Sequence, residues 1–102
     1  MTTENPELLK AKLNTETAQI SWLELQKFFA AGKVIQVDAS LDLVEVATQS
    51  ALNNSAQIDQ WQQQGLVGLV TDEQAGEWFE QQKTLWGVVV SPWVLVQDKQ
   101  EQ

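Results

Sequence analysis

The sequence predicts a single α+β domain, with four to five helices and a small sheet of about three to five short strands. Three observations indicate this class. The chain has 102 residues, which is close to the usual size of one domain. Apolar residues follow a helical period in some segments and form short β-branched runs in others, and capping residues and glycines separate the two kinds. We expect residues 1–98 to form the domain and residues 99–102 to be a disordered tail.

The first helix is expected to be short and to begin at Asn5 and Pro6. Asparagine is suited to cap a helix, and proline is suited to the first helical position. Leu8, Leu9 and Leu13 recur at intervals that place them on one face. The polar run "NTETAQ" separates this helix from the next one.

The second helix is predicted with a clear start and end. Ser21 and Glu24 have the spacing of a capping box, and an apolar stripe follows them. Gly32 is suited to end the helix, because glycine readily adopts the left-handed conformation found there. Residues 33–37, "KVIQV", then indicate a short strand.

The middle of the chain carries an ambiguous period. Leu41–Val46 fits both a strand and a helix. We prefer a helix that extends to Leu52, because Asp42 and Glu45 have the spacing of a capping box. The polar turn "NNS" leads into a further helix that Gly65 is expected to end.

The last third of the chain is expected to supply most of the sheet. Leu66–Val70 indicates a buried strand, and Thr71 with Gln74 predicts a capping box at the start of another helix. Leu85–Gln97 is apolar over nearly its whole length. Because Pro92 lacks an amide donor, we expect two strands angled at this proline or one bent strand.

The composition excludes several kinds of chemistry. The chain contains no Cys, His or Tyr, and its six basic residues are all lysines. Without Cys or His there is no thiolate or imidazole nucleophile and none of the usual zinc or haem ligation. Without Arg, no planar fork is present to grip a phosphate or carboxylate through two hydrogen bonds. We therefore expect no catalytic residues, no metal ligands and no cofactor.

The charge is strongly acidic, with a net value of −8. The lysines are scattered, so no basic patch is present to neutralise phosphates or an anionic membrane surface. The amino terminus lacks the basic start and apolar run of a signal peptide. We expect a cytoplasmic protein that contacts neither nucleic acid nor membrane.

Residues 21–70 resemble a winged helix in their expected order of elements, and "LVEVATQSALNNSAQIDQWQQQGLV" is similar to its helix-turn-helix core. The turn departs from the motif by one extra residue and by Ala51, where the motif favours glycine. Residues 55–64, in the position of the recognition helix, contain Asp59 and no lysine. The resemblance implies a transcriptional regulator, whereas the charge of this helix argues against contact with DNA.

A resemblance over most of the chain is carried by "LLKAKLNTETAQISWLELQKFF", "LDLVEVA" and "VVVSPWVLVQ". These motifs are similar to a small bacterial family known as domain of unknown function 2288. The resemblance implies a single small prokaryotic domain and no catalytic residues.

Three carboxylates, Asp38, Asp42 and Glu45, lie within eight residues and are the first candidates for a cation site. Asp42 and Glu45 also stand where helix caps belong, and we prefer this structural role. Paired acids for glycoside-type chemistry would need to combine these groups with acids further along, namely Asp72, Glu73 and Glu77. Solvated helix faces explain the later acids more simply. Lys33 is interpreted as a solvated charge rather than an activated amine.

The tryptophans divide into two groups. Trp22, Trp61 and Trp78 fall at apolar positions of predicted helices and are expected to pack in the core. Trp86 and Trp93 lie in the apolar segment near the end of the chain, where both faces of a strand would be apolar.

This last segment is the candidate interface. A small domain with few helices would leave one of its faces, or an open edge, for a partner. The candidate interface residues are Trp86, Val88, Val89, Val90, Pro92, Trp93, Val94 and Leu95. The alternative is a central strand covered wholly within the monomer.

We interpret the chain as an uncharacterised protein that works by association, as a homodimer or with another protein partner. One alternative is a winged-helix-type transcriptional regulator. A further alternative is a carboxylate-dependent enzyme or metal binder.

Overall fold

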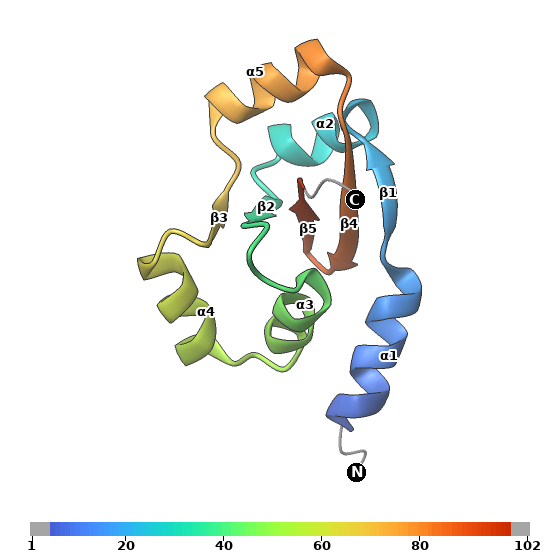
Figure 1. Ribbon diagram of the computed structural model, residues 1–102, viewed down its shortest axis with the longest axis vertical. Helices are drawn as coiled ribbons and strands as arrows, with labels where there is room; N and C mark the ends of the chain where they lie inside the picture. Colours follow the sequence, from blue (N-terminus) through green and yellow to red (C-terminus); the bar gives the residue numbers. More distant parts are fainter. Residues whose placement is uncertain (1–4, 99–102) are drawn as a thin grey trace.

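The computed structural model describes residues 5–98 and shows a single α+β domain (Figure 1). The helices are α1 (Pro6–Glu16), α2 (Trp22–Ala30), α3 (Leu43–Ala51), α4 (Ser55–Gln63) and α5 (Asp72–Gln81). The strands are β1 (Ala18–Ser21), β2 (Val34–Val37), β3 (Val67–Leu69), β4 (Thr84–Val90) and β5 (Trp93–Gln97). The predicted class is confirmed, and the predicted tail at 99–102 lies outside the described residues. Over the described range, none of the helices is long and apolar enough to cross a membrane.

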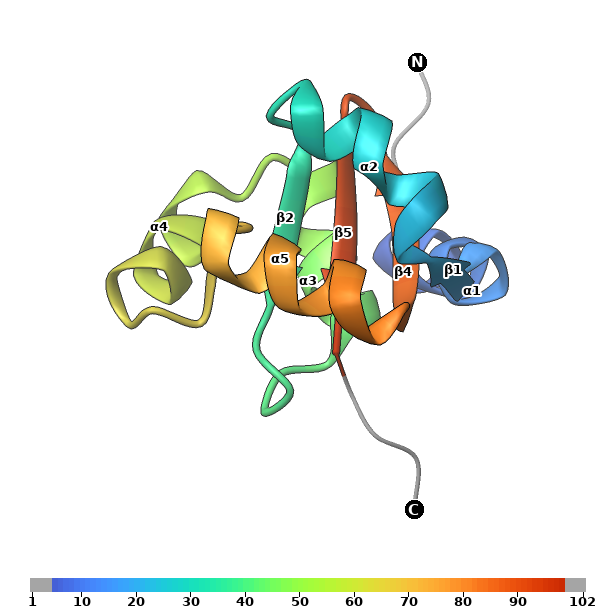
Figure 2. The ribbon, with the colours of Figure 1, turned by 90° about the horizontal axis from the view of Figure 1, so that it is seen from above.

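The five strands form one mixed sheet in the order β1-β4-β5-β2-β3. Strands β2 and β5 run parallel, and the other neighbouring pairs are antiparallel. Helices α2 and α5 lie on one face of the sheet and α1 and α3 on the other, with α4 beside α3 (Figure 2). The sheet is therefore enclosed between two helical layers.

Each face of the sheet has its own hydrophobic core. Val94 and Val96 of β5 pack with Trp22 and other residues of the first cluster, whereas Leu95 packs with Val88 in the second. Successive residues of a strand point to opposite faces, so β5 contributes to both clusters. The expectation that the helices leave one face of this segment uncovered is therefore wrong for the middle of β5.

The apolar segment near the chain end forms a hairpin rather than an open edge. The chain reverses at Ser91 and Pro92, and β4 and β5 pair with Val90 opposite Trp93. Each strand has a neighbour on its other side, β1 beside β4 and β2 beside β5. The expected division into two strands at Pro92 is found, but the strands reverse into a hairpin rather than meeting at an angle, and the expectation of a free edge is wrong because both strands pair inside the sheet.

Most helix ends follow the predicted capping chemistry. Thr71 and Gln74 form a complete capping box. Asp42 accepts a hydrogen bond from the Val44 N–H at 3.0 Å, and α3 begins at Leu43, which resolves the ambiguous segment as helix. The Glu45 carboxylate does not complete the capping box with the Asp42 backbone. It accepts hydrogen bonds from the side chains of Lys10 and Gln49 instead.

Two elements differ from expectation near the start of the chain. The first helix extends through 11 residues to Glu16 and is not short. The polar run at 14–19 supplies the end of α1 and the beginning of β1, and β1 pairs with β4 so that Ile20 lies opposite Leu85. Ala18 and Ile20 alternate with Gln19 and Ser21 in this edge strand, but four residues with one large apolar side chain give only a weak strand pattern.

Residues 21–70 have the order of elements expected from the winged-helix resemblance. Helix α2, strand β2, helices α3 and α4 and strand β3 follow one another as expected, and Asn53 occupies a left-handed conformation (φ 61°) in the turn between the two helices. Strand β3 then leads into α5, as the capping box at Thr71 predicted. The sheet also includes β4 and β5, which lie outside this segment, so the resemblance describes only part of the fold.

A candidate binding groove beside Trp93

The predicted interface residues divide by burial. Val88, Val94 and Leu95 are buried in the two clusters and belong to the core. Trp86 and Val90 are half-buried. Val89, Pro92 and Trp93 are exposed at the hairpin end, with Val89 57% and Trp93 41% exposed. These exposed residues are the part of the predicted interface that a partner can reach.

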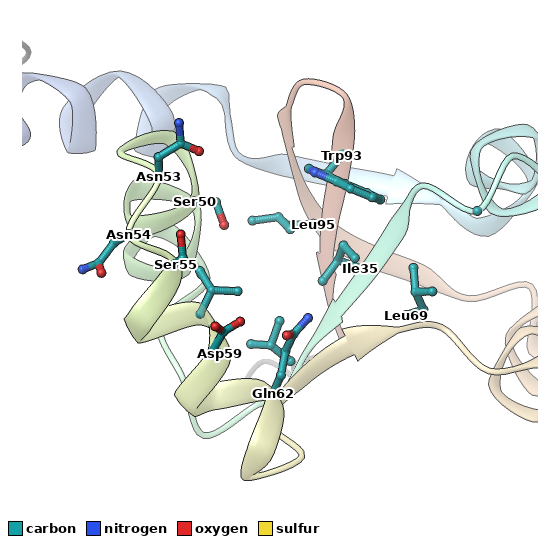
Figure 3. A pocket seen from close by; sticks show the side chains of 13 residues that line it. Ile35, Ser50, Asn53, Asn54, Ser55, Asp59, Gln62, Leu69, Trp93 and Leu95 are labelled. Carbon is teal, nitrogen blue, oxygen red and sulfur yellow. The ribbon is translucent and has the colours of Figure 1, made fainter.

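A groove of about 470 Å³ lies beside Trp93, between the sheet and the α3–α4 pair (Figure 3). Its apolar wall comes from strands β2, β3 and β5. Ile35 of β2 pairs with Leu69 on one side and Leu95 on the other, and Trp93 shares the face of Leu95. The register therefore brings together side chains that are distant in sequence. The volume falls within the range of protein sites that hold small ligands or side-chain anchors.

The other wall of the groove is mostly polar and comes from the end of α3, the turn after it and α4, which also contributes Ile58. Ser55, Asp59 and Gln62 are spaced by four and three residues, which places them on one face of α4. Asn54 accepts a hydrogen bond from the Gln57 N–H and donates to Gln49 at 2.8 Å, so the turn is held in place. The remaining polar lining residues are Ser50 and Asn53 (Figure 3).

The charge that lines the groove is of one sign, negative. Among the described residues that line it, Asp59 is the single charged side chain. The ion pairs found between residues 5 and 98 are Lys10–Glu45 and Lys83–Asp98, so Asp59 belongs to neither. The groove thus combines an apolar wall with a carboxylate that forms no ion pair with a lysine of residues 5–98.

A second hollow of about 440 Å³ lies on the opposite face, between α2 and the β1–β4 pair. Leu23, Phe28 and Val89 contribute its apolar surface. Lys27 and Glu24 both line it, and the Lys27 Nζ stands 5.2 Å from the centroid of the Phe28 ring. This hollow therefore has balanced charge.

The early carboxylates have structural partners. Asp38 accepts hydrogen bonds from the Ser40 hydroxyl and amide at 2.6 and 2.9 Å, which lower the pKa of its carboxyl. Hydrogen bonds from Lys10 and Gln49 lower the pKa of Glu45. Within residues 5–98, no group of three or more acidic side chains is placed to hold a metal ion. Asp72 and Glu73 lie in the first turn of α5.

The helical tryptophans pack as predicted, to different degrees. Trp22 and Trp78 are buried together in the first cluster, with ring centroids 5.3 Å apart in an edge-to-face arrangement. Trp61 is half-buried against the second cluster. Lys33, considered as an activated amine, is exposed at the loop before β2.

The groove was only partly visible in the sequence. Trp93 and Leu95 were among the predicted interface residues, whereas Ile35 and Leu69 were assigned only to buried strands. Their contribution depends on strand register, which neither segment reveals alone. The polar wall did leave a signal, because Ser55, Asp59 and Gln62 share one helical face.

Fold and groove together define a small α+β protein whose mixed sheet lies between two helical layers. The chain belongs to the family described as protein of unknown function (DUF2288), which matches residues 8–98. This confirms the family expected from the sequence motifs. The solved structure described as the NMR solution structure of PA1075 from Pseudomonas aeruginosa is similar, with 46% identity and a TM-score of 0.80. The match covers 99% of this chain and 94% of that chain. No curated protein matches the sequence.

Proposed function

We propose that this protein is an interaction module that binds another polypeptide through the groove, with Trp93 as the central contact. The observation that carries the proposal is the exposed apolar surface of the groove. Trp93 is 41% exposed and Leu69 is 58% exposed, and both line the groove together with the half-buried Ile35. Tryptophan is enriched among the residues that contribute most to binding energy at protein interfaces.

The rigid surroundings of Trp93 support this role. Val94 next to it is buried, and its amide donates to the Lys33 carbonyl at 2.9 Å. Leu95 on the same face is buried beneath the groove. An anchor held by a central strand loses little backbone freedom on binding, so more of its contact energy is retained in the complex.

The polypeptide bound in this way is either a second copy of the chain or a different protein. A homodimer would bring two equivalent surfaces together about a twofold axis. A heterologous complex would leave the isolated protein monomeric. The two arrangements use the same residues and differ in oligomeric state.

Sedimentation velocity across a concentration series tests the proposal, comparing wild type with Trp93→Ala. Phe79→Ala is the matched control, because Phe79 is 54% exposed on α5 and does not line the groove. Circular dichroism checks that each variant is folded. Self-association that is lost only in Trp93→Ala assigns the groove to a homodimer, and a monomer at every concentration excludes the homodimer. Self-association that survives Trp93→Ala would place the interface elsewhere and contradict the proposal.

A further inference from the structure

We infer that the groove binds an amphipathic, basic segment of a different protein, in which an apolar side chain stands next to a lysine or arginine. The inference rests on the proposed function and names the chemistry of the partner. It follows from the two unlike walls of the groove and from the sign of its charge.

The walls require an occupant with two kinds of surface. Ile35, Leu69 and Trp93 offer apolar contact on the sheet side, whereas Ser55, Asp59 and Gln62 offer oxygen and nitrogen atoms on the α4 side (Figure 3). A wholly apolar occupant would remove the polar wall from water without replacing its hydrogen bonds, which is costly. An occupant with an apolar group and an adjacent polar group satisfies both walls.

The negative charge of Asp59 favours a cationic group as the polar group of the occupant. Its carboxylate belongs to neither ion pair found in residues 5–98, so a lysine or arginine would gain a partner without breaking an existing one. The amino-terminal end of α4 favours the opposite charge, because a helix carries about half a positive charge there. That end is already capped by the Asn54 side chain, whereas Asp59 carries a full charge on the groove face. The net preference is for a cation.

The charge of the whole chain argues against a second copy as the occupant. The net charge of −8 makes two copies repel, whereas a basic partner is attracted. The chain also has six lysines and no arginine, and Lys10 and Lys83 already form ion pairs. The hollow on the other face lacks this selectivity, because Lys27 and Glu24 both line it.

Three capped peptides of matched size test the inference: acetyl-Leu-Lys-Leu-amide and its versions with Gln or Glu in place of Lys. Binding is followed by ¹⁵N NMR of the full chain, using the resonances of the Ile35 and Leu69 backbone amides and of the Trp93 indole. The indole resonance is assigned by its disappearance in Trp93→Phe. We expect the Lys peptide to shift these resonances saturably and to bind about two- to fivefold more tightly than the Gln peptide, with the Glu peptide weakest. Added salt should reduce the difference.

Two variants locate the charge preference. Asp59→Asn should bind the Lys and Gln peptides with equal affinity, so that the preference for Lys is lost. Glu80→Gln removes the same charge from an exposed position on α5 and should keep the Lys preference. Equal loss of preference in both variants would show that net charge, and not Asp59, attracts the peptide, and would overturn the inference.

The remaining outcomes separate this inference from the proposed function. Equal binding of all three peptides at Trp93, or tightest binding of the Glu peptide, would overturn the basic-partner inference and leave the groove as an interaction site. Absence of any shift in these resonances at about 10 mM peptide would also overturn it, because even weak millimolar affinity is detectable at that concentration. A homodimer that depends on Trp93 would overturn it as well, since the occupant would then be a second copy.

Discussion

Neighbouring residues of β5 have different roles because a strand sends successive side chains to opposite faces. Val94 and Val96 complete one core, Leu95 completes the other, and Trp93 remains at the surface where the covering helices end. Gln97 is buried and donates from its Nε2 to the carbonyls of Asp38 and Leu41 at 2.9 and 2.7 Å. It thereby ties the loop before α3 to the end of β5.

Gly87 lies where neighbouring atoms occupy the space that a side chain would need. A Cβ added there would lie 2.8 Å from Ile20 Cδ1 and 3.4 Å from the Leu95 carbonyl oxygen. The Ile20 contact is with the end of a flexible side chain that can rotate aside, so Gly87→Ala should change the free energy of unfolding by less than about 1 kcal/mol, measured by urea denaturation. Gly76→Ala is the control, because a Cβ there meets open space within α5 and should raise stability by about 0.5–1 kcal/mol. A loss of more than about 2 kcal/mol in Gly87→Ala would show that Ile20 cannot move and would contradict this expectation.

Glu45 links stability to pH. Its pKa is lowered by hydrogen bonds from Lys10 and Gln49, so the charged form is the one that the folded state stabilises. This contribution is present above the ordinary glutamate pKa of about 4.3 and is lost as the pH falls through the lowered value. Glu45→Gln should therefore reduce the stability lost between neutral and acidic pH, measured by thermal unfolding across that range. An unchanged pH dependence would show that the pair contributes nothing.

At the scale of elements, the helix caps and glycine stops were predictable and the edge strand was not. Gly32 and Gly65 both adopt positive φ after their helices, as their positions in the sequence indicated. Strand β1 was missed because its place in the sheet depends on pairing with β4, more than sixty residues away, and not on its own pattern. The same holds for the groove wall, since Ile35 and Leu69 become neighbours only through the β2–β3 register.

Leu13 is the buried anchor of helix α1, alongside the partly buried Leu9 and the Lys10–Glu45 ion pair. Leu13 is buried in the second cluster, whereas Leu8 on the same helix is 69% exposed. Leu13→Ala should lower the free energy of unfolding by about 2–5 kcal/mol, because it opens a cavity between α1 and its neighbours. Leu8→Ala removes the same atoms from the surface and should change stability by less than about 0.5 kcal/mol, measured in the same urea titration. Equal effects of the two substitutions would contradict this attachment.

At the scale of the whole molecule, two helical layers cover most of the sheet and leave the hairpin end open. Both edge strands are short, with four residues in β1 and three in β3, and short edges limit pairing between sheets. The sequence predicts one apolar surface from Trp86 to Leu95, and the fold exposes Trp93 and Val89 of this segment but buries other residues of β4 and β5. Their burial depends on which helices cover each face, which is a property of the complete fold.

The most direct test of the groove as an interaction site is the solvent accessibility of the five tryptophan indoles in the free protein. A soluble nitroxide broadens the ¹⁵N-bound indole proton resonances of residues that it can approach. We expect strong broadening for Trp93, which is exposed, and sharp resonances for Trp22 and Trp78, which are buried. A Trp93 resonance as sharp as that of Trp22 in the monomer would show that the groove is closed in solution and would contradict the proposed function.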